Sequence, residues 1–369
     1  MNKNLEKLIA LDKSAYSTDV SPFFTNCKNA IVFESSGIYA PYLDVALRSL
    51  IYNADDDKCY DIIILTKEID LFDCNLISAQ IKPYKNISIR FYDPTRIVEK
   101  YIKKAKYYYL NLNYFKLAIP WILDKYEKVL NLGMDVVIKK DVSKLFDIQM
   151  DETEYIAGAI DLGYIGRLSM DIPKEELDLK NPEGYINADV LVFNNMLIRK
   201  DFSMDNVMEL WQKYKFRCAE QDALNILYEN HIHYLDLNWN VMPRKMASMV
   251  HIAHNTDNNI KLWKECLKNP YIVHFAAYPK SWDYPDVEFA NEWWCYARQS
   301  PYYEELIRRM ILANKGFIIS SKTPLDKKIY NKLLRMFSDK SKLLRLLKRV
   351  YIKLFKNKEE NFKFGKLGN

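Results

Sequence analysis

Short apolar runs rich in β-branched residues alternate with segments of helical periodicity from Ala30 onwards. The apolar runs predict strands, which are expected at 30–33, 61–65, 87–92, 128–132, 155–160, 190–193, 233–237 and 271–275. The periodic segments predict helices, which are expected near 41–53, 70–81, 115–125, 203–215 and 220–230. Strands that alternate with helices indicate an α/β fold with a largely parallel sheet, covered by helices on both faces.

The pattern also divides the chain. Residues 1–29 have little periodicity and are interpreted as an N-terminal leader, and residues 30–285 form the predicted α/β domain. After about residue 286 the pattern becomes helical, without another convincing strand. The 369 residues are enough for one large domain and a helical C-terminal region, 286–369.

Charge is concentrated at the C-terminal end. Residues 324–369 hold 11 Lys and 3 Arg against 2 Asp and 2 Glu, so their net charge is +10 within a chain of net charge +6. Placed on a helix, residues 342–356 separate into an apolar face and a cationic face. Such a helix favours an anionic membrane surface as a partner, and the alternative is a helix that packs on the domain with its cations in water.

Composition excludes several classes of function. The chain is 49% apolar with nine glycines, and it contains neither GxGxxG nor GxxxxGK[ST]. The six cysteines are scattered without a CxxC pair, which favours reduced thiols and a cytoplasmic location. No apolar leader and no apolar run of about 18 residues is present, so neither a signal peptide nor a membrane span is expected. The mildly acidic body lacks a nucleic-acid-binding motif, and no nucleic acid partner is expected.

Chemistry is expected at the carboxyl ends of the strands, where ligands of such sheets bind. Asp135 and Asp161 follow predicted strands, and His274 lies near the end of another. A carboxylate such as Asp135 is costly there unless it binds a cation, although it could also be an ordinary turn residue. His274 could equally be a buried core histidine. His251 and His254 have the spacing of paired zinc ligands, but no third ligand is evident.

Six blocks of sequence share an order along residues 30–285 that resembles a known family. They are AIVF at 30–33 with Tyr39 and Tyr42-Leu43, YFKL at 114–117 leading into KVLNLGMD at 128–135, AGAID at 157–161, YINADVL at 185–191, EQDALN at 220–225 with Trp239-Asn240, and HFAAYPKSW at 274–282. The chain resembles the family 8 glycosyltransferases, retaining enzymes of the GT-A fold that include bacterial lipopolysaccharide hexosyltransferases.

The resemblance implies transfer of a hexose, glucose or galactose, from a UDP-sugar to a cell-surface glycan or glycolipid acceptor at the inner face of the membrane. It implies that Asp135 and His274 bind a divalent cation, manganese or magnesium, and that Lys280 meets the pyrophosphate. The residues implied to bind the nucleotide are Ile31, Phe33, Tyr39, Lys116 and Lys280, and those implied to act on the sugar are Gln221, Asp222, Asp161 and Asn187. Because the amide of Gln221 is a poor nucleophile, a front-face displacement is expected rather than a covalent intermediate.

The departures from the family pattern cluster at the nucleotide and metal end. Gly133 stands where the first carboxylate of a DxD motif is expected, and Asp189 replaces a glycine. The others are Ser36-Gly37-Ile38, Lys116, Ala277 and Ser281. Loss of a carboxylate should weaken metal binding unless Asp189 compensates. Two alternatives follow, a non-catalytic homologue that acts as a binding or scaffold subunit and a metal-independent transferase.

Overall fold

The structure is a computed structural model that describes residues 15–102, 111–163, 179–213, 216, 218–243, 256–276 and 278–314. Its described residues up to Met310 belong to one compact unit. The centre of that unit is a seven-stranded sheet of order β3-β2-β1-β4-β7-β6-β8. The strands are β1 (Asn29–Glu34), β2 (Tyr60–Leu65), β3 (Ile87–Tyr92), β4 (Lys128–Leu132), β6 (Ile156–Ile160), β7 (Ile186–Asn194) and β8 (Ile232–Tyr234).

The sheet is mostly parallel, as predicted. β3, β2, β1 and β4 are parallel neighbours, and β6 is parallel to β8. Only β7 in this sheet runs the other way, paired antiparallel with both β4 and β6. β7 therefore begins where β4 ends, which brings the start of one strand beside the carboxyl end of the other.

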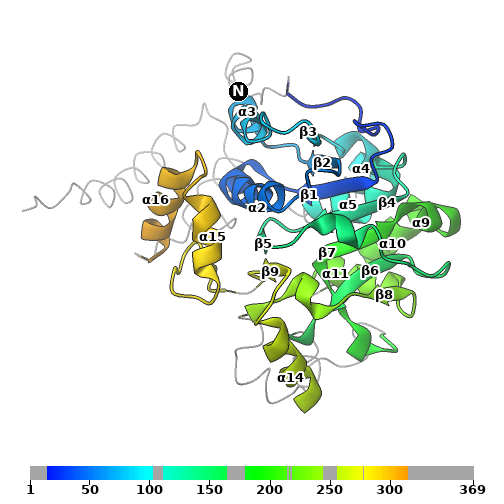
Figure 1. The fold of residues 1–369 in the computed structure, drawn as a ribbon. Coiled ribbons are helices and arrows are strands. Elements are labelled where there is room, and N and C mark those ends of the chain that lie inside the picture. Colours follow the sequence, from blue (N-terminus) through cyan, green and yellow to red (C-terminus); the bar gives the residue numbers. More distant parts are fainter. Residues whose placement is uncertain are drawn as a thin grey trace, which may run out of the picture. The chain divides into compact units, whose positions relative to one another are not determined.

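Helices cover both faces of the sheet (Figure 1). In β1, Ile31 and Phe33 face one apolar core, whereas Ala30 and Val32 face the other. The helices on the first side are α2 (Ala40–Tyr52), α3 (Leu71–Ala79), α15 (Ala290–Ala297) and the start of α16 (Tyr303–Asn314). Those on the second side are α4 (Thr95–Ile102), α5 (Asn111–Leu117), α6 (Ile119–Ile122), α9 (Asn195–Asp201), α10 (Met204–Lys213) and α11 (Glu220–Leu227). Because β1 is buried on both faces, its apolar run is continuous.

A second, two-stranded sheet joins β5 (Val136–Ile138) to β9 (Ile272–His274) in antiparallel pairing. The sequence reading missed β5, because three apolar residues directly after a strand carry no periodicity of their own. β9 is preceded by α14 (Asp257–Cys266) and by the short 3-10 turn η5 (Leu237–Asn240). Among the described residues, the other 3-10 turns are η1 (Gly37–Tyr39), η3 (Val142–Leu145) and η4 (Pro182–Gly184). The β5–β9 pair matters because it places Val136 opposite His274.

Other differences from the predicted elements have local causes. The helix expected at 115–125 is divided into α5 and α6 near Pro120, which lacks the N–H that a continuous helix needs. The strand expected at 233–237 ends at Tyr234, and the 3-10 turn η5 follows. Helices α4, α9 and α14 were not predicted.

Within the described residues, no helix is both long and apolar enough to cross a membrane. The basic segment 324–369 and the histidine pair His251 and His254 lie outside the described residues. The predictions made for them therefore stay predictions.

Candidate active site

The carboxyl end of β4 leads into a tight turn. Gly133, Met134 and Asp135 form this turn between β4 and β5, so neither Gly133 nor Asp135 belongs to a strand. The turn is tied to its neighbours through the backbone, since Gly133 N donates to Asp189 O at 2.8 Å and Phe275 N donates to Asp135 O at 2.9 Å. Asp135 is consequently fixed between β7 and the end of β9.

His274 turns its imidazole into the same place. It is the last residue of β9 and is 1% exposed. Its Nδ1 lies 2.9 Å from Asn240 Oδ1. Its Nε2 lies 3.3 Å from Asp135 Oδ1 and 3.4 Å from Asp189 Oδ2, yet it makes no hydrogen bond of good geometry with any described residue. The carboxamide oxygen keeps a proton on Nδ1, so Nε2 is the ring nitrogen that can bind a cation once it gives up its own proton.

Asp189 completes a group of three. One atom each from Asp135, Asp189 and His274 can be chosen so that all lie within 4.8 Å of one another. Asp189 comes from β7, the strand that begins beside the end of β4. The sequence marked Asp189 as a departure from the family pattern that could compensate for Gly133, but its approach to His274 depends on how β4 and β7 pair.

Two lysines neutralise the carboxylates. Lys116 Nζ lies 2.9 Å from Asp189 Oδ1 and 3.3 Å from Glu220 Oε1, and its side chain is 6% exposed. Lys280 Nζ lies 2.6 Å from Asp135 Oδ2. Each carboxylate thus gives one oxygen to a lysine and turns the other towards His274 Nε2.

These neighbours set the protonation of the site. Burial favours the neutral acid, but Lys280 and then His274 hold the pKa of Asp135 below its ordinary value. Lys116 outweighs burial in the same way and holds the pKa of Asp189 well below its ordinary value. Burial would lower the pKa of His274, but the two carboxylates raise it to about 9. Both acids are therefore anionic at neutral pH, as metal ligands must be.

A second group of polar side chains lies behind the first. Asn187 Nδ2 donates to Asp161 Oδ2 at 3.3 Å and to Gln221 Oε1 at 3.1 Å. Gln221 Nε2 also donates to Asp161 Oδ2, at 3.2 Å. All three side chains are buried, and they come from the ends of β6, β7 and α11. The structure brings together three of the four residues that the resemblance assigned to the sugar.

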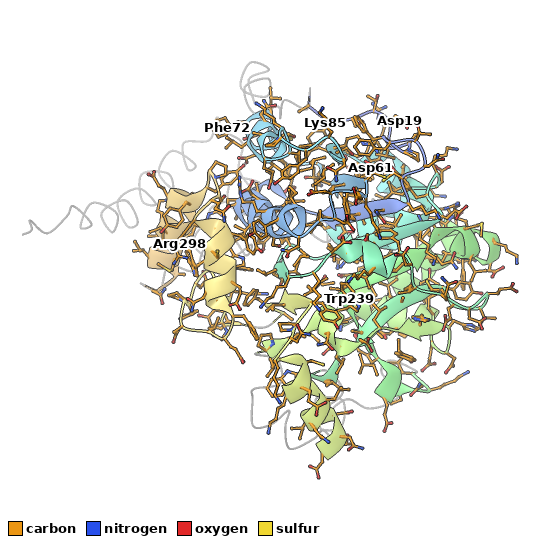
Figure 2. All side chains as sticks on the ribbon, viewed as in Figure 1. Asp19, Asp61, Phe72, Lys85, Trp239 and Arg298 are labelled. Carbon is orange, nitrogen blue, oxygen red and sulfur yellow. The ribbon has the colours of Figure 1, made fainter. Side chains whose placement is uncertain are left out.

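Asn240 connects the two groups, and its role was not foreseen. Its Nδ2 donates to Asn187 Oδ1 at 2.9 Å, while its Oδ1 faces His274 Nδ1. Trp239, labelled in Figure 2, is the preceding residue on η5. The only signal in the sequence was the Trp239-Asn240 pair within one of the blocks, which did not indicate what Asn240 contacts.

Four other residues that the resemblance assigned to the site make none of the hydrogen bonds described above for these two groups. Asp222 accepts from Tyr185 Oη at 2.6 Å and from Cys218 N at 2.8 Å, so its carboxylate braces the turn before α11. The side chains of Ile31 and Phe33 are fully buried in the core. Tyr39 is half-buried at the start of α2.

The residues present fit a divalent cation. Hard carboxylate oxygens with an imidazole are suitable ligands for manganese or magnesium. His274 Nε2 is a buried polar atom without a hydrogen-bonding partner among the described residues, and it is directed at two carboxylates. Buried polar atoms are rarely left without a partner unless something else binds them.

Comparison with known proteins agrees with this architecture. The chain is 25% identical over 278 residues to "Glycosyltransferase GlyB" of Streptococcus pneumoniae, covering 72% of this chain and 61% of GlyB. It is 23% identical over 269 residues to "General stress protein A" of Bacillus subtilis, covering 66% of this chain and 84% of that protein. The chain thus spans less than two thirds of GlyB.

Solved structures share the fold. The bifunctional glycosyltransferase WbbM matches with a TM-score of 0.73 and 22% identity, covering 79% of this chain and 53% of WbbM. The galactosyltransferase LgtC, solved with donor and acceptor sugar analogues, matches with a TM-score of 0.59 and 22% identity, covering 74% of this chain and 96% of LgtC. These likenesses confirm the predicted GT-A fold. Residues 30–286 match the family model for glycosyl transferase family 8, and the chain therefore belongs to that family.

Proposed function

We propose that the chain is a retaining glycosyltransferase that moves a hexose, glucose or galactose, from a UDP-sugar to a cell-surface glycan acceptor such as lipopolysaccharide or another surface polysaccharide or glycoprotein. The observation that carries this proposal is the continuity of the two polar groups at the end of the sheet. His274 is joined through Asn240 to Asn187, and Asn187 contacts both Asp161 and Gln221. Groups suited to a pyrophosphate and groups suited to sugar hydroxyls thus form one assembly.

The reaction breaks the bond between the anomeric carbon and the diphosphate oxygen and forms one from that carbon to an acceptor oxygen. The acceptor proton leaves with the departing diphosphate. Asp135 and His274 would hold a divalent ion, which would supply charge stabilisation for the diphosphate. Lys280, beside Asp135, adds a second positive charge at the same end.

Gln221 orients rather than attacks. Its Oε1 accepts from Asn187 Nδ2 and from Ala188 N, both at 3.1 Å, and its Nε2 is held by Asp161. An amide used in this way positions its neighbours but forms no covalent intermediate. This arrangement supports a front-face displacement with retention.

The test is release of UDP from UDP-glucose and UDP-galactose in the presence of Mn²⁺. We expect turnover by the wild-type chain, and a loss of more than about 100-fold in Asp135→Asn, since even partners of metal ligands cost about 10–100-fold. Absence of UDP release from any UDP-sugar, with or without an acceptor glycan, would contradict the proposal and favour the non-catalytic scaffold.

A metal-independent transferase is the second candidate. It is favoured by one contact, because Lys280 Nζ already places a cation 2.6 Å from Asp135 Oδ2. In that case EDTA would leave turnover unchanged, and Asp135→Asn would have little effect.

We extend the proposal to location, with the chain peripheral on the inner face of the cell membrane. The support is the sequence of residues 324–369, with its net charge of +10. The full chain should sediment with vesicles that contain anionic lipid and remain in the supernatant with neutral phosphatidylcholine vesicles. If the full chain remained in the supernatant with anionic vesicles as well as with neutral ones, the membrane anchor would be ruled out.

A further inference from the structure

Gly133 and Asp189 compete for one space. They continue the antiparallel pairing of β4 with β7, one step beyond the pair Leu132 and Val190. Directly opposed residues of an antiparallel pair point to the same face. A Cβ built on Gly133 would lie 2.9 Å from Asp189 Cβ and 3.1 Å from Asp189 Cγ, and the first distance is closer than real Cβ atoms come. The Asp189 side chain therefore occupies the place that a side chain at 133 would take.

A carboxylate in that place reaches the same neighbours from either strand. The Cβ position at Gly133 is 3.1 Å from Asp135 Oδ1, the oxygen that faces His274. From β7, Asp189 brings Oδ2 to 3.4 Å from His274 Nε2. Adjacent ligands of an octahedral ion bound at about 2.1 Å are about 3 Å apart. The distances from His274 Nε2 to Asp135 Oδ1 and to Asp189 Oδ2, 3.3 and 3.4 Å, approach this spacing.

His274 supplies an independent indication that the group binds a ligand. Its Nε2 is buried and has no hydrogen-bonding partner among the residues that the structure describes. Asn240 Oδ1 holds the ring through Nδ1, so a rotation of the imidazole that moved Nε2 away from the carboxylates would break that hydrogen bond. An acidic pair alone would be satisfied by its lysines, whereas a buried ring nitrogen without a hydrogen bond, directed between two carboxylates, marks a place where a cation would replace the ring's own proton.

We propose that the metal carboxylate absent at Gly133 is supplied by Asp189 across the strand pair, so that Asp135, Asp189 and His274 are the protein ligands of one divalent cation. The proposal rests on the proposed function for the identity of the site, but it makes its own claim about metal binding. It also removes the main reason for regarding the chain as a non-catalytic homologue, because the site has exchanged the position of a carboxylate instead of losing it.

The competing role for Asp189 is that of a counter-ion for Lys116. Glu220 offers a matched control, because Lys116 Nζ contacts Glu220 Oε1 as well as Asp189 Oδ1. Glu220 is absent from the group of ligating atoms around His274. Removing either acid leaves Lys116 with one carboxylate, but only one of the two changes removes a metal ligand.

The experiment is a titration of the full chain with Mn²⁺ alone, followed by the electron paramagnetic resonance signal of free Mn²⁺, and repeated with UDP. We expect Asp189→Asn to weaken Mn²⁺ binding by more than about 100-fold and Glu220→Gln to change it less than about threefold. Equal losses in both variants, or unchanged binding in Asp189→Asn beside a loss in Asp135→Asn, would overturn the proposal. So would the absence of Mn²⁺ binding by the wild-type chain in the millimolar range.

A second experiment moves the carboxylate from β7 back to position 133, as a control for misfolding of the single variant. Asp189→Gly should lose Mn²⁺ binding, and Gly133→Asp combined with Asp189→Gly should recover it to within about tenfold, with thermal melting used to confirm that both are folded. Failure of a folded double variant to bind better than the single variant would contradict the exchange. Because Mn²⁺ is titrated without a sugar nucleotide, a chain that binds the metal as expected but releases no UDP would refute the proposed activity alone.

Discussion

Two buried ionic clusters lie at opposite ends of the parallel strands of the seven-stranded sheet, one near the start of β2 and one beyond the carboxyl end of β4. Asp61, labelled in Figure 2, is the second residue of β2 and is fully buried. Its Oδ1 accepts from Ser88 Oγ at 2.5 Å, and its Oδ2 accepts from Phe23 N at 2.8 Å and from Tyr126 Oη. Arg90 Nη2 contacts both oxygens, at 3.0 and 2.9 Å. The carboxylate of Asp61 is thus enclosed by donors of this chain.

The cluster at the carboxyl edge is different. Asp135 and Asp189 each use one oxygen on a lysine, and the other oxygens converge on an imidazole nitrogen that has no hydrogen-bonding partner in the described part of the chain. Both clusters contain buried acids and cations, so charge and burial do not separate them. They differ in where the unpartnered atom lies. Arg90 Nε also lacks a partner among the described residues, but both oxygens of Asp61 accept hydrogen bonds. In the second cluster the unpartnered atom is His274 Nε2, which two carboxylate oxygens face. A carboxylate surrounded by donors holds the fold together, while atoms left convergent and unsatisfied indicate a ligand.

The largest effect should follow from breaking the enclosed cluster. Asp61→Asn leaves Arg90 buried beside a neutral side chain, which is expected to lower the free energy of unfolding by about 3–5 kcal/mol. Urea unfolding measures this loss. Binding of Mn²⁺ by the fraction that remains folded should be unchanged, and a specific loss of metal affinity would show that the two clusters are not independent.

Substitution of Asn240, which connects the two polar groups of the site, should instead lower Mn²⁺ affinity. Asn240→Ala removes the oxygen that orients His274 Nδ1, so Mn²⁺ affinity should fall by about 10–100-fold. As a control, Asn195→Ala also deletes a buried carboxamide, but its bond goes to Leu123 O, away from the site. The same titration should find Mn²⁺ affinity unchanged in that control. Similar affinities in both variants would mean that Asn240 does not position the imidazole.

The pH dependence of Mn²⁺ affinity should be a smaller effect. Since the pKa of His274 is raised to about 9 without metal, from an ordinary value of 6.5, Mn²⁺ must displace a proton below that pH. Apparent Mn²⁺ affinity should therefore rise by up to about tenfold per pH unit between pH 7 and 9, and then level off. A flat profile over this range would contradict the assignment of His274 as a ligand.

The same shift has the opposite consequence for the metal-free chain. A folded-state pKa above the unfolded value stabilises the fold fully below pH 6.5, and this contribution is lost as the pH rises through about 9. Urea unfolding in EDTA should show the decline in the wild-type chain, and His274→Gln should reduce it.

The two regions also differ in how far the sequence foretold them. β3 and β4 have the predicted bounds, because each is a distinct run rich in apolar residues that is wholly or partly buried. Asp135 and His274 were identified from the blocks that surround them. Asp189 was a candidate replacement for the carboxylate missing at Gly133, but its placement could not be predicted, because it depends on β7 running antiparallel to β4 and on the space above Gly133. Asn240 was missed for a similar reason, since its two contacts lie far away in the sequence.

The most direct test is a crystal structure of the full chain soaked with Mn²⁺ and UDP, with anomalous diffraction recorded at the manganese edge. The account predicts one strong anomalous peak bonded to Asp135, Asp189 and His274 Nε2, each within about 2.5 Å, with Gly133 close against the Asp189 side chain. A peak bonded to Asp135 and His274 alone, with Asp189 still on Lys116 and a water in the remaining position, would contradict the transfer of the carboxylate from one strand to the other.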